Sequence, residues 1–218
     1  MFDKQLKRLA APFIALALAA CASASAPDSQ GPAPARGEAM VTAANPHAVN
    51  AAMQILGEGG NAVDAAIAAE FVLGLVEPQS SGIGGGGFLM FYDGRSEAIT
   101  AYDGRERAPA GATPTMFLDS RGRPLPFMDA QASGRSIGAP SLVAMLKMAH
   151  EEHGRLPWAR LVEPAMQLAE DGFEVSPRLA RLIAAYGEHG RLRADFAARA
   201  YFFDAAGAPR PVGYLLRN

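Results

Sequence analysis

Cysteine is almost absent from this sequence, since Cys21 is the only one in 218 residues. Small exported domains usually depend on disulfides, so residues 22–218 must instead hold their fold by core packing. Excess positive charge is also lacking, because the net charge is -2. That balance excludes the electrostatic attraction on which nucleic-acid binding depends. The apolar run at residues 9–20 is shorter than the roughly 20 residues that span a bilayer.

The first twenty residues instead have the layout of a secretory signal peptide. Lys4, Lys7 and Arg8 form a short cationic head, and the apolar run follows directly. The run ends in "LAAC", which resembles the lipobox of bacterial lipoproteins. This resemblance implies that residues 1–20 are removed and that Cys21 carries a lipid anchor.

An ordinary signal peptide, cut at an A-x-A-like site formed by residues 22–24, is the alternative for this terminus. Residues 21–38 are rich in Ala, Ser and Pro, a composition that predicts a flexible tether. We therefore expect an exported protein, located in the periplasm or at the outer membrane as a lipid-anchored protein. Its folded part is expected to cover residues 39–218.

The folded part has the pattern of an α+β protein. Periodic apolar residues with capping residues predict helices, and short apolar runs predict strands. The expected helices are residues 46–60, 62–76, 140–154, 156–172 (split in two at Pro164) and 176–187. The expected strands are residues 39–44, 88–93 and 96–103, the last two joined in an antiparallel hairpin. Residues 116–138 are expected to be irregular, and residues 200–216 to form a short strand, a turn and an extended piece.

Helix starts and buried faces can be predicted residue by residue. Asn45 and Asn61 are the expected N-caps, and Asp64 lies in the first turn of its helix, where a carboxylate suits the dipole. Helix 62–76 is apolar nearly all round, which predicts burial on most sides. The expected inward faces are Val49, Ala52, Met53 and Leu56 in helix 46–60, and Leu179, Leu182, Ile183 and Tyr186 in helix 176–187.

The glycine run "SSGIGGGG" matches a dinucleotide fingerprint in letters only. Gly82, Gly84 and Gly87 satisfy G-x-G-x-x-G, and Asp103 follows at about the expected distance. That fingerprint needs a strand before it and a helix after it, so that the helix N-terminus meets the pyrophosphate. Here a helix precedes the run and a strand follows it. We therefore expect no cofactor, and interpret the glycines as residues chosen for close backbone packing, with an anion-holding nest as a secondary possibility.

The four histidines, His47, His150, His153 and His189, suggest no metal site. The spacing in "HEEH" is one residue short of the H-E-x-x-H zinc motif. Both of its histidines fall in the last turn of a predicted helix, where a partial positive charge is favoured. We interpret them as a solvated helix end.

Arg105, in "YDGRERAP", is the candidate binding residue. It follows a strand end and a glycine, so its side chain can project into a pocket from a rigid backbone. A planar guanidinium there suits bidentate capture of a substrate carboxylate. The alternative is that Arg105 only pairs with Asp103 or Glu106 at the surface.

Several uncommon strings, in order, resemble the gamma-glutamyltransferases (gamma-glutamyltranspeptidases). They include "NPHAVNAAMQILGEGGNAVDAAIAAEFVLGLVEPQSSGIGGGGFLMFYD", "DGRERAP" and "SGRSIGAPSLVAMLKMAHEEHGRLPWARLVEPAMQLAEDGFEVSPRLA". The resemblance covers about residues 39–216 and points to the N-terminal portion of the large subunit. It implies an N-terminal-nucleophile hydrolase with an αββα sandwich, in which a proenzyme cuts itself to expose a nucleophilic threonine. It also implies that Arg105 holds the α-carboxylate of the gamma-glutamyl group.

The family's reaction needs parts that have no counterpart in this sequence. The threonines are Thr42, Thr100, Thr113 and Thr115, and none stands in a Thr-Thr-His-type context. The resemblance therefore implies that no catalytic residue lies in this chain. It implies that the nucleophile lies beyond Asn218, on a small subunit from the same precursor. It also implies that the sandwich is incomplete, with one sheet face uncovered. The small-molecule partner would be glutathione or a related gamma-glutamyl compound, whose glutamyl group passes to water, an amino acid or a peptide.

Two alternatives remain beside a fragment of an exported gamma-glutamyltransferase. One is a related acylase of the same superfamily, such as a cephalosporin acylase or a poly-gamma-glutamate transpeptidase. The other is a non-catalytic envelope lipoprotein that keeps the fold as a binding module. Reading the coding DNA past Asn218 separates them, because a Thr-Thr-His-like junction supports an enzyme and an in-frame stop supports a module.

We predict that the 218-residue polypeptide alone has no turnover, because the nucleophile is expected elsewhere. The measurement is release of p-nitroaniline from gamma-glutamyl p-nitroanilide by the purified chain. Hydrolysis above the buffer rate would contradict this prediction.

Overall fold

The computed structural model describes residues 39–189 and 191–218, with the side chains of 188, 189 and 191 left aside. Residues Met40–Asn218 form one compact unit. The expected signal segment, the tether and Cys21 lie outside the described residues. Residues 39–44 are not a strand as predicted, because no described segment pairs with them to form a ladder. No described helix is long and apolar enough to cross a membrane.

Two capped helices follow, α2 (Pro46–Gly57) and α3 (Ala62–Val76). Asn45 caps α2, and Asn61 and Asp64 form a capping box at the start of α3, as the sequence predicts. α3 is buried on most sides, also as predicted. The buried residues of α2 are Ala48, Ala51, Ala52 and Ile55, so only Ala52 of the predicted face is confirmed as buried. Three small alanines and Ile55 form the inward face, and the alanines let α2 approach its neighbours closely.

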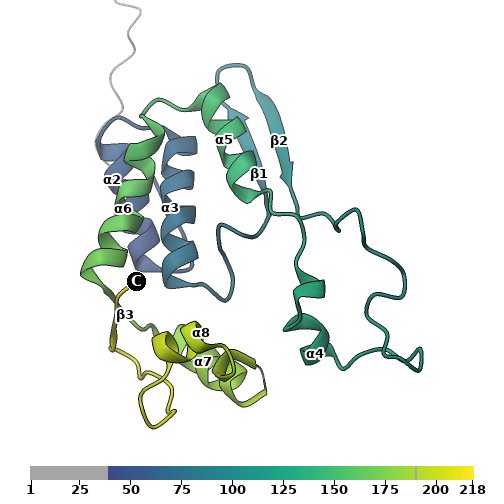
Figure 1. Cartoon of the computed structure of the whole chain (residues 1–218). Coiled ribbons are helices and arrows are strands. Elements are labelled where there is room, and N and C mark those ends of the chain that lie inside the picture. Colours follow the sequence, from purple (N-terminus) through teal and green to yellow (C-terminus); the bar gives the residue numbers. More distant parts are fainter. Residues whose placement is uncertain (1–38, 190) are drawn as a thin grey trace, which may run out of the picture. The chain divides into compact units, whose positions relative to one another are not determined.

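α3 is the central helix of the described unit. It packs against α2, α6 (Trp158–Asp171) and α5 (Leu142–His153), as Figure 1 shows. The predicted split of α6 at Pro164 is wrong, because the helix continues through this proline. Pro164 is itself buried, so packing of α6 in the core compensates for the hydrogen bond that the proline cannot donate.

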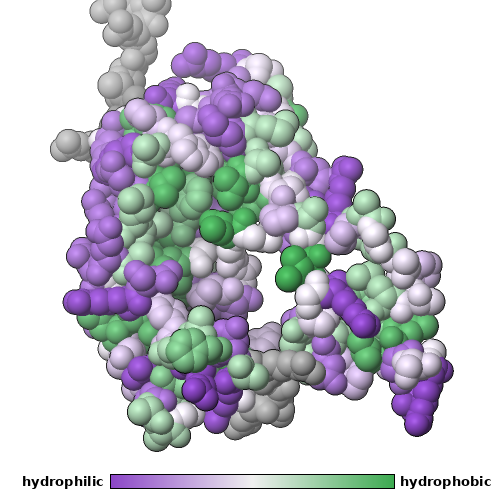
Figure 2. Space-filling view, viewed as in Figure 1, coloured by the Kyte–Doolittle hydropathy of each residue, from purple (hydrophilic) through white to green (hydrophobic). Residues whose placement is uncertain are grey.

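The predicted hairpin is confirmed as β1 (Gly87–Asp93) and β2 (Ala98–Gly104), paired antiparallel from Gly87↔Gly104 to Asp93↔Ala98. One face packs on α5 and the core. The other face is apolar and exposed, and its large side chains are Phe88 (69% exposed), Met90 (73%), Tyr92 (60%) and Ile99 (64%). The space-filling view shows apolar residues (green) on the surface and around a hollow in it (Figure 2). An exposed apolar sheet face of this kind suits coverage by further protein.

The segment after β2 is less irregular than predicted. It contains α4 (Phe127–Gln131) and the short helix η1 (Gly134–Ser136). The predicted turn at Arg121-Gly122 is confirmed, with Gly122 at φ 75°, and Arg123 pairs with Asp119 beside it. Local hydrogen bonds in this segment, such as that of Arg123 N–H to Asp119 Oδ1, replace the apolar periodicity that the prediction relied on.

The C-terminal part contains α7 (Pro177–His189), η2 (Arg191–Arg193) and α8 (Phe196–Phe202), with β3 (Phe173–Glu174) paired to β4 (Leu215–Leu216). The strand predicted near residue 201 is wrong, because Asp195 accepts a hydrogen bond from Ala198 N–H and starts α8. Phe203 is extended after it, and a turn with Gly207 at φ 81° follows. The predicted inward face of α7 lines an apolar cavity of about 590 Å³, and Leu179 and Ile183 are buried.

Candidate functional site

The glycine run crosses the end of β2, and at Gly86 the crossing leaves no space for a side chain. A Cβ atom on Gly86 would overlap the carbonyl oxygen of Gly104 and lie 2.7 Å from Glu106 N. A Cβ on Gly104 would in turn lie 2.6 Å from the Cβ of Met145 in α5. The interpretation of the run as close backbone packing is therefore confirmed, and the crossing fixes the run against the residues that flank Arg105.

A buried carboxylate, Glu77, holds the start of this segment directly after α3. Its Oε1 accepts from Asn45 Nδ2 (3.0 Å), and its Oε2 accepts from Arg178 Nη1 (2.7 Å). Arg178 also donates to Ser80 Oγ at 2.9 Å. Glu77 therefore ties the first residues of α2 and α7 to the loop that leads into the glycines. Sequence reasoning missed this pair, although an acid placed directly after an apolar helix was a signal for it.

Arg105 comes immediately after β2, and its main chain is held on both sides. Its N–H donates to Asp103 Oδ1 (3.0 Å), and its carbonyl oxygen accepts from Ser141 Oγ (3.1 Å). Its side chain is 68% exposed and its Nε lies 3.4 Å from Glu106 Oε2. The structure thus shows the surface ion pair that the alternative interpretation expected, made through Nε of Arg105.

Two cavities meet at Arg105. A cavity of about 890 Å³ is lined by the glycine run together with Arg105, Glu106, Arg178 and part of α5. A second cavity, of about 450 Å³, shares Gly84, Arg105 and Glu106 with the first. A guanidinium in this position can form two parallel hydrogen bonds to a carboxylate. None of the four threonines lines either cavity.

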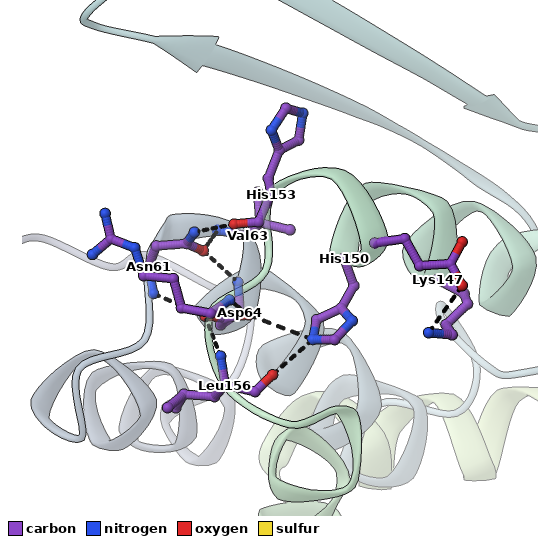
Figure 3. A network of polar contacts seen from close by, with 9 residues as sticks. Asn61, Val63, Asp64, Lys147, His150, His153 and Leu156 are labelled. Carbon is purple, nitrogen blue, oxygen red and sulfur yellow. Dashed lines mark hydrogen bonds and ion pairs between the residues drawn. The ribbon is translucent and has the colours of Figure 1, made fainter.

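The two histidines of "HEEH" are packed rather than solvated, which corrects the prediction. His150 donates from Nε2 to the carbonyl oxygen of Leu156 (2.8 Å), and the same nitrogen lies 3.9 Å from Asp64 Oδ1. Figure 3 shows this ring directed toward Asp64 and Leu156. Asp64 is fully buried and also accepts from the Leu156 and Arg155 N–H groups. These contacts lock the start of α3 to the loop before α6.

His153 belongs to a second structural cluster, between α5 and the hairpin. Its ring stacks on Phe91 with the centroids 4.2 Å apart, and Nε2 lies 2.8 Å from the Tyr102 hydroxyl. That hydroxyl donates to Glu152 Oε2 (2.6 Å). Burial, and then the Glu152 carboxylate, raise the pKa of Tyr102 to about 12, so the hydroxyl stays a donor at neutral pH. No group of three or more potential ligand side chains in the described chain could hold a metal ion.

Comparison with known proteins identifies one matching family and several similar proteins. The family model described as Gamma-glutamyltranspeptidase matches residues 48–218. A glutathione hydrolase proenzyme from Bacillus subtilis (strain 168) is 44% identical over 151 residues, which are 69% of this chain and 26% of that relative. The crystal structure of Helicobacter pylori gamma-glutamyltranspeptidase superposes with a TM-score of 0.76 at 32% identity, over 82% of this chain and 50% of that one. Cephalosporin acylase from Bacillus halodurans gives a TM-score of 0.65 at 28% identity, over 88% of this chain and 37% of that one.

These structural neighbours confirm the α+β, N-terminal-nucleophile hydrolase fold class that the sequence predicts. The chain spans about a quarter of the length of the curated relatives it matches, and half of the Helicobacter pylori chain.

The close crossing at the glycine run gives a matched pair of substitutions. Gly86→Ala is expected to lower the free energy of unfolding by about 1–3 kcal/mol, because the added methyl group meets backbone atoms that cannot move aside. Gly84→Ala is the control, because a Cβ there meets nothing within 4 Å. Urea unfolding of the three proteins gives the comparison. Equal midpoints for the two variants would contradict the packing role of Gly86.

Proposed function

The chain belongs to the gamma-glutamyltranspeptidase family, and from this membership we propose that it forms the donor-binding part of an exported gamma-glutamyltransferase. The complete enzyme would cleave the gamma-glutamyl amide of glutathione and related compounds, and would transfer the glutamyl group to water, an amino acid or a peptide. The family is an enzyme family, and its sequence match covers most of the described chain. Over the superposed structures, identity is 28% to the cephalosporin acylase and 32% to the Helicobacter pylori gamma-glutamyltranspeptidase.

The single observation that carries the proposal is the setting of Arg105. Its main chain follows the end of β2 and is held by hydrogen bonds to Asp103 and Ser141. The residue lines both cavities. Its partner, Glu106, lies 3.4 Å from Nε, and we propose that the terminal N–H groups donate to a ligand carboxylate. We assign Arg105 to the α-carboxylate of the gamma-glutamyl group, which places the gamma-amide away from Arg105, toward the open part of the cavity.

In this mechanism the chain binds and orients the donor. The attacking group would be the N-terminal threonine of a small subunit, with its own α-amine as the base. Binding the donor at its α-carboxylate lowers the entropic part of the activation free energy, because the donor is already oriented before attack. The exposed apolar face of the hairpin, with Phe88, Met90 and Tyr92, is where we place the second sheet of the sandwich, contributed by that small subunit.

The N-terminal residues support an additional proposal, that the protein is exported and anchored by lipid on Cys21. The support is the cationic head, the apolar run and the "LAAC" ending. Residues 21–38 would then act as the tether and residues 39–218 as the folded part.

The anchor has a direct test in a bacterial host that has an outer membrane. Mass spectrometry of the mature N-terminal peptide is expected to show lipid on Cys21, and Cys21→Ser is expected to move the protein from the membrane fraction to the soluble fraction. A mature chain that begins after Ala24 without lipid would support an ordinary signal peptide instead.

The binding role of Arg105 is tested in the processed enzyme that carries this chain. Arg105→Gln is expected to raise KM for gamma-glutamyl p-nitroanilide roughly 10- to 100-fold, the loss of a charged, two-point hydrogen bond. Arg105→Lys keeps the charge but not the planar two-point donor, so its KM should lie between those of the parent enzyme and Arg105→Gln. Arg95→Gln, an exposed arginine in the hairpin turn, is the control. An Arg105→Gln enzyme with the KM of this control would refute the assignment.

A further inference from the structure

The smaller of the two cavities at Arg105 is rich in arginine. Arg105, Arg107 and Arg135 all line its volume of about 450 Å³. Glu106 is the one acid among its lining residues in the described chain. The formal charge of the lining is therefore +2, which is uncommon for a cavity in a protein with a net charge of -2.

The arginine donors of this cavity are largely available. Arg105 uses its Nε toward Glu106, and Arg135 uses one nitrogen, Nη1, toward the carbonyl oxygen of Met116 (2.8 Å). Within residues 39–189 and 191–218, the side chain of Arg107 has no hydrogen bond or ion pair. Like charges gathered without matching acids repel one another, so an anion that binds among them gains from all three.

Main-chain contacts fix the position of these arginines. The carbonyl oxygen of Arg107 accepts from Ala139 N–H (2.8 Å), which joins the segment after β2 to the segment after η1. Gly138 is packed tightly between them, because a Cβ there would lie 2.9 Å from the Cβ of Glu106. Arg135 lies within η1, just before this junction. The cavity is thus built by a defined crossing of two segments.

Most of the remaining lining side chains are apolar, and Ser136 is the polar one among them. The larger apolar residues are Pro109, Met116, Phe117 and Ile137. Guanidinium groups beside apolar side chains suit a ligand with an aliphatic part and a carboxylate, whereas an inorganic anion would leave the apolar side chains unused.

We propose that this arginine cavity binds a second carboxylate of the substrate, carried by the amino acid or peptide joined to the gamma-glutamyl nitrogen. This partner is the leaving group of a donor or the incoming acceptor, and both share the same chemistry. The proposal rests on the proposed function, because Arg105 then holds the α-carboxylate on one side while Arg107 and Arg135 hold the second carboxylate on the other. It predicts a preference for amino acids and peptides with a free carboxylate over neutral amines.

The test compares donors with acidic and neutral leaving groups in the processed enzyme. The two donors are gamma-glutamylglycine and gamma-glutamyl p-nitroanilide. In the double variant Arg107→Gln/Arg135→Gln, the ratio of KM for the acidic donor to KM for the neutral donor is expected to rise roughly tenfold. Arg121→Gln is the control, because this exposed arginine lies outside the cavity lining, and its ratio should match that of the parent.

A second pair of substrates separates the two sources of the carboxylate. With gamma-glutamyl p-nitroanilide as the common donor, glycylglycine and glycylglycinamide serve as acceptors. If the double variant raises KM for glycylglycine but not for glycylglycinamide, the cavity binds the carboxylate of the acceptor. If it raises the KM ratio of the two donors, the cavity binds the carboxylate of the leaving group.

The outcomes also distinguish this inference from the function it rests on. Unchanged ratios in both substrate pairs, with Arg105→Gln still impaired, would overturn the second carboxylate site and leave the proposed function standing. An enzyme that turns over no gamma-glutamyl donor would overturn both. Because Arg107 and Arg135 are exposed, equal melting temperatures of parent and double variant are expected, and these exclude misfolding as the cause of a changed ratio.

Discussion

The site depends on one steric constraint, the crossing of backbones at Gly86 and Gly104. Gly86 lies against the carbonyl oxygen of Gly104, and Gly104 lies against Met145 of α5, with no room for a methyl group at either position. Because Gly86 meets backbone atoms and Gly104 meets the Met145 side chain close to its own backbone, these contacts fix the path of the chain where it leaves β2. Arg105 is the next residue, so its position follows from the crossing rather than from contacts of its own exposed side chain.

Two buried carboxylates at opposite ends of α3 hold the surrounding frame. Asp64 accepts main-chain N–H groups from the loop before α6, and Glu77 accepts from Asn45 and Arg178. Asp64 lies in the first turn of α3 and Glu77 caps its C-terminal end, and α3 packs against α2, α5 and α6. A buried charge is tolerated only when it is paired and hydrogen-bonded, so each carboxylate also selects the arrangement in which its partners meet it. Through Glu77 and Arg178, the position of the glycine run is linked to the packing of α7.

Local patterns predicted much of this structure. The caps at Asn45 and Asn61, the buried helix 62–76, the hairpin and the packing role of the glycine run depend on residues close in sequence. The buried face of α2 was mispredicted because close helix packing buries three alanines with Ile55 instead of the larger predicted residues. Helix α6 was not broken because core contacts compensate for Pro164. The Glu77–Arg178 pair and the arginine cavity join segments far apart in sequence, which periodicity does not reveal. Arg105 was predicted as a binding residue from its strand-end position, whereas Arg107 and Arg135 could be proposed only from the fold.

Arg105 is proposed to receive the α-carboxylate of a gamma-glutamyl ligand at the meeting point of two cavities. A crystal structure of the processed enzyme with bound L-glutamate tests this role most directly. We expect both oxygens of the α-carboxylate within roughly 3 Å of the Arg105 guanidinium nitrogens. Glutamate held by Arg178 instead, with Arg105 still paired only to Glu106, would contradict it.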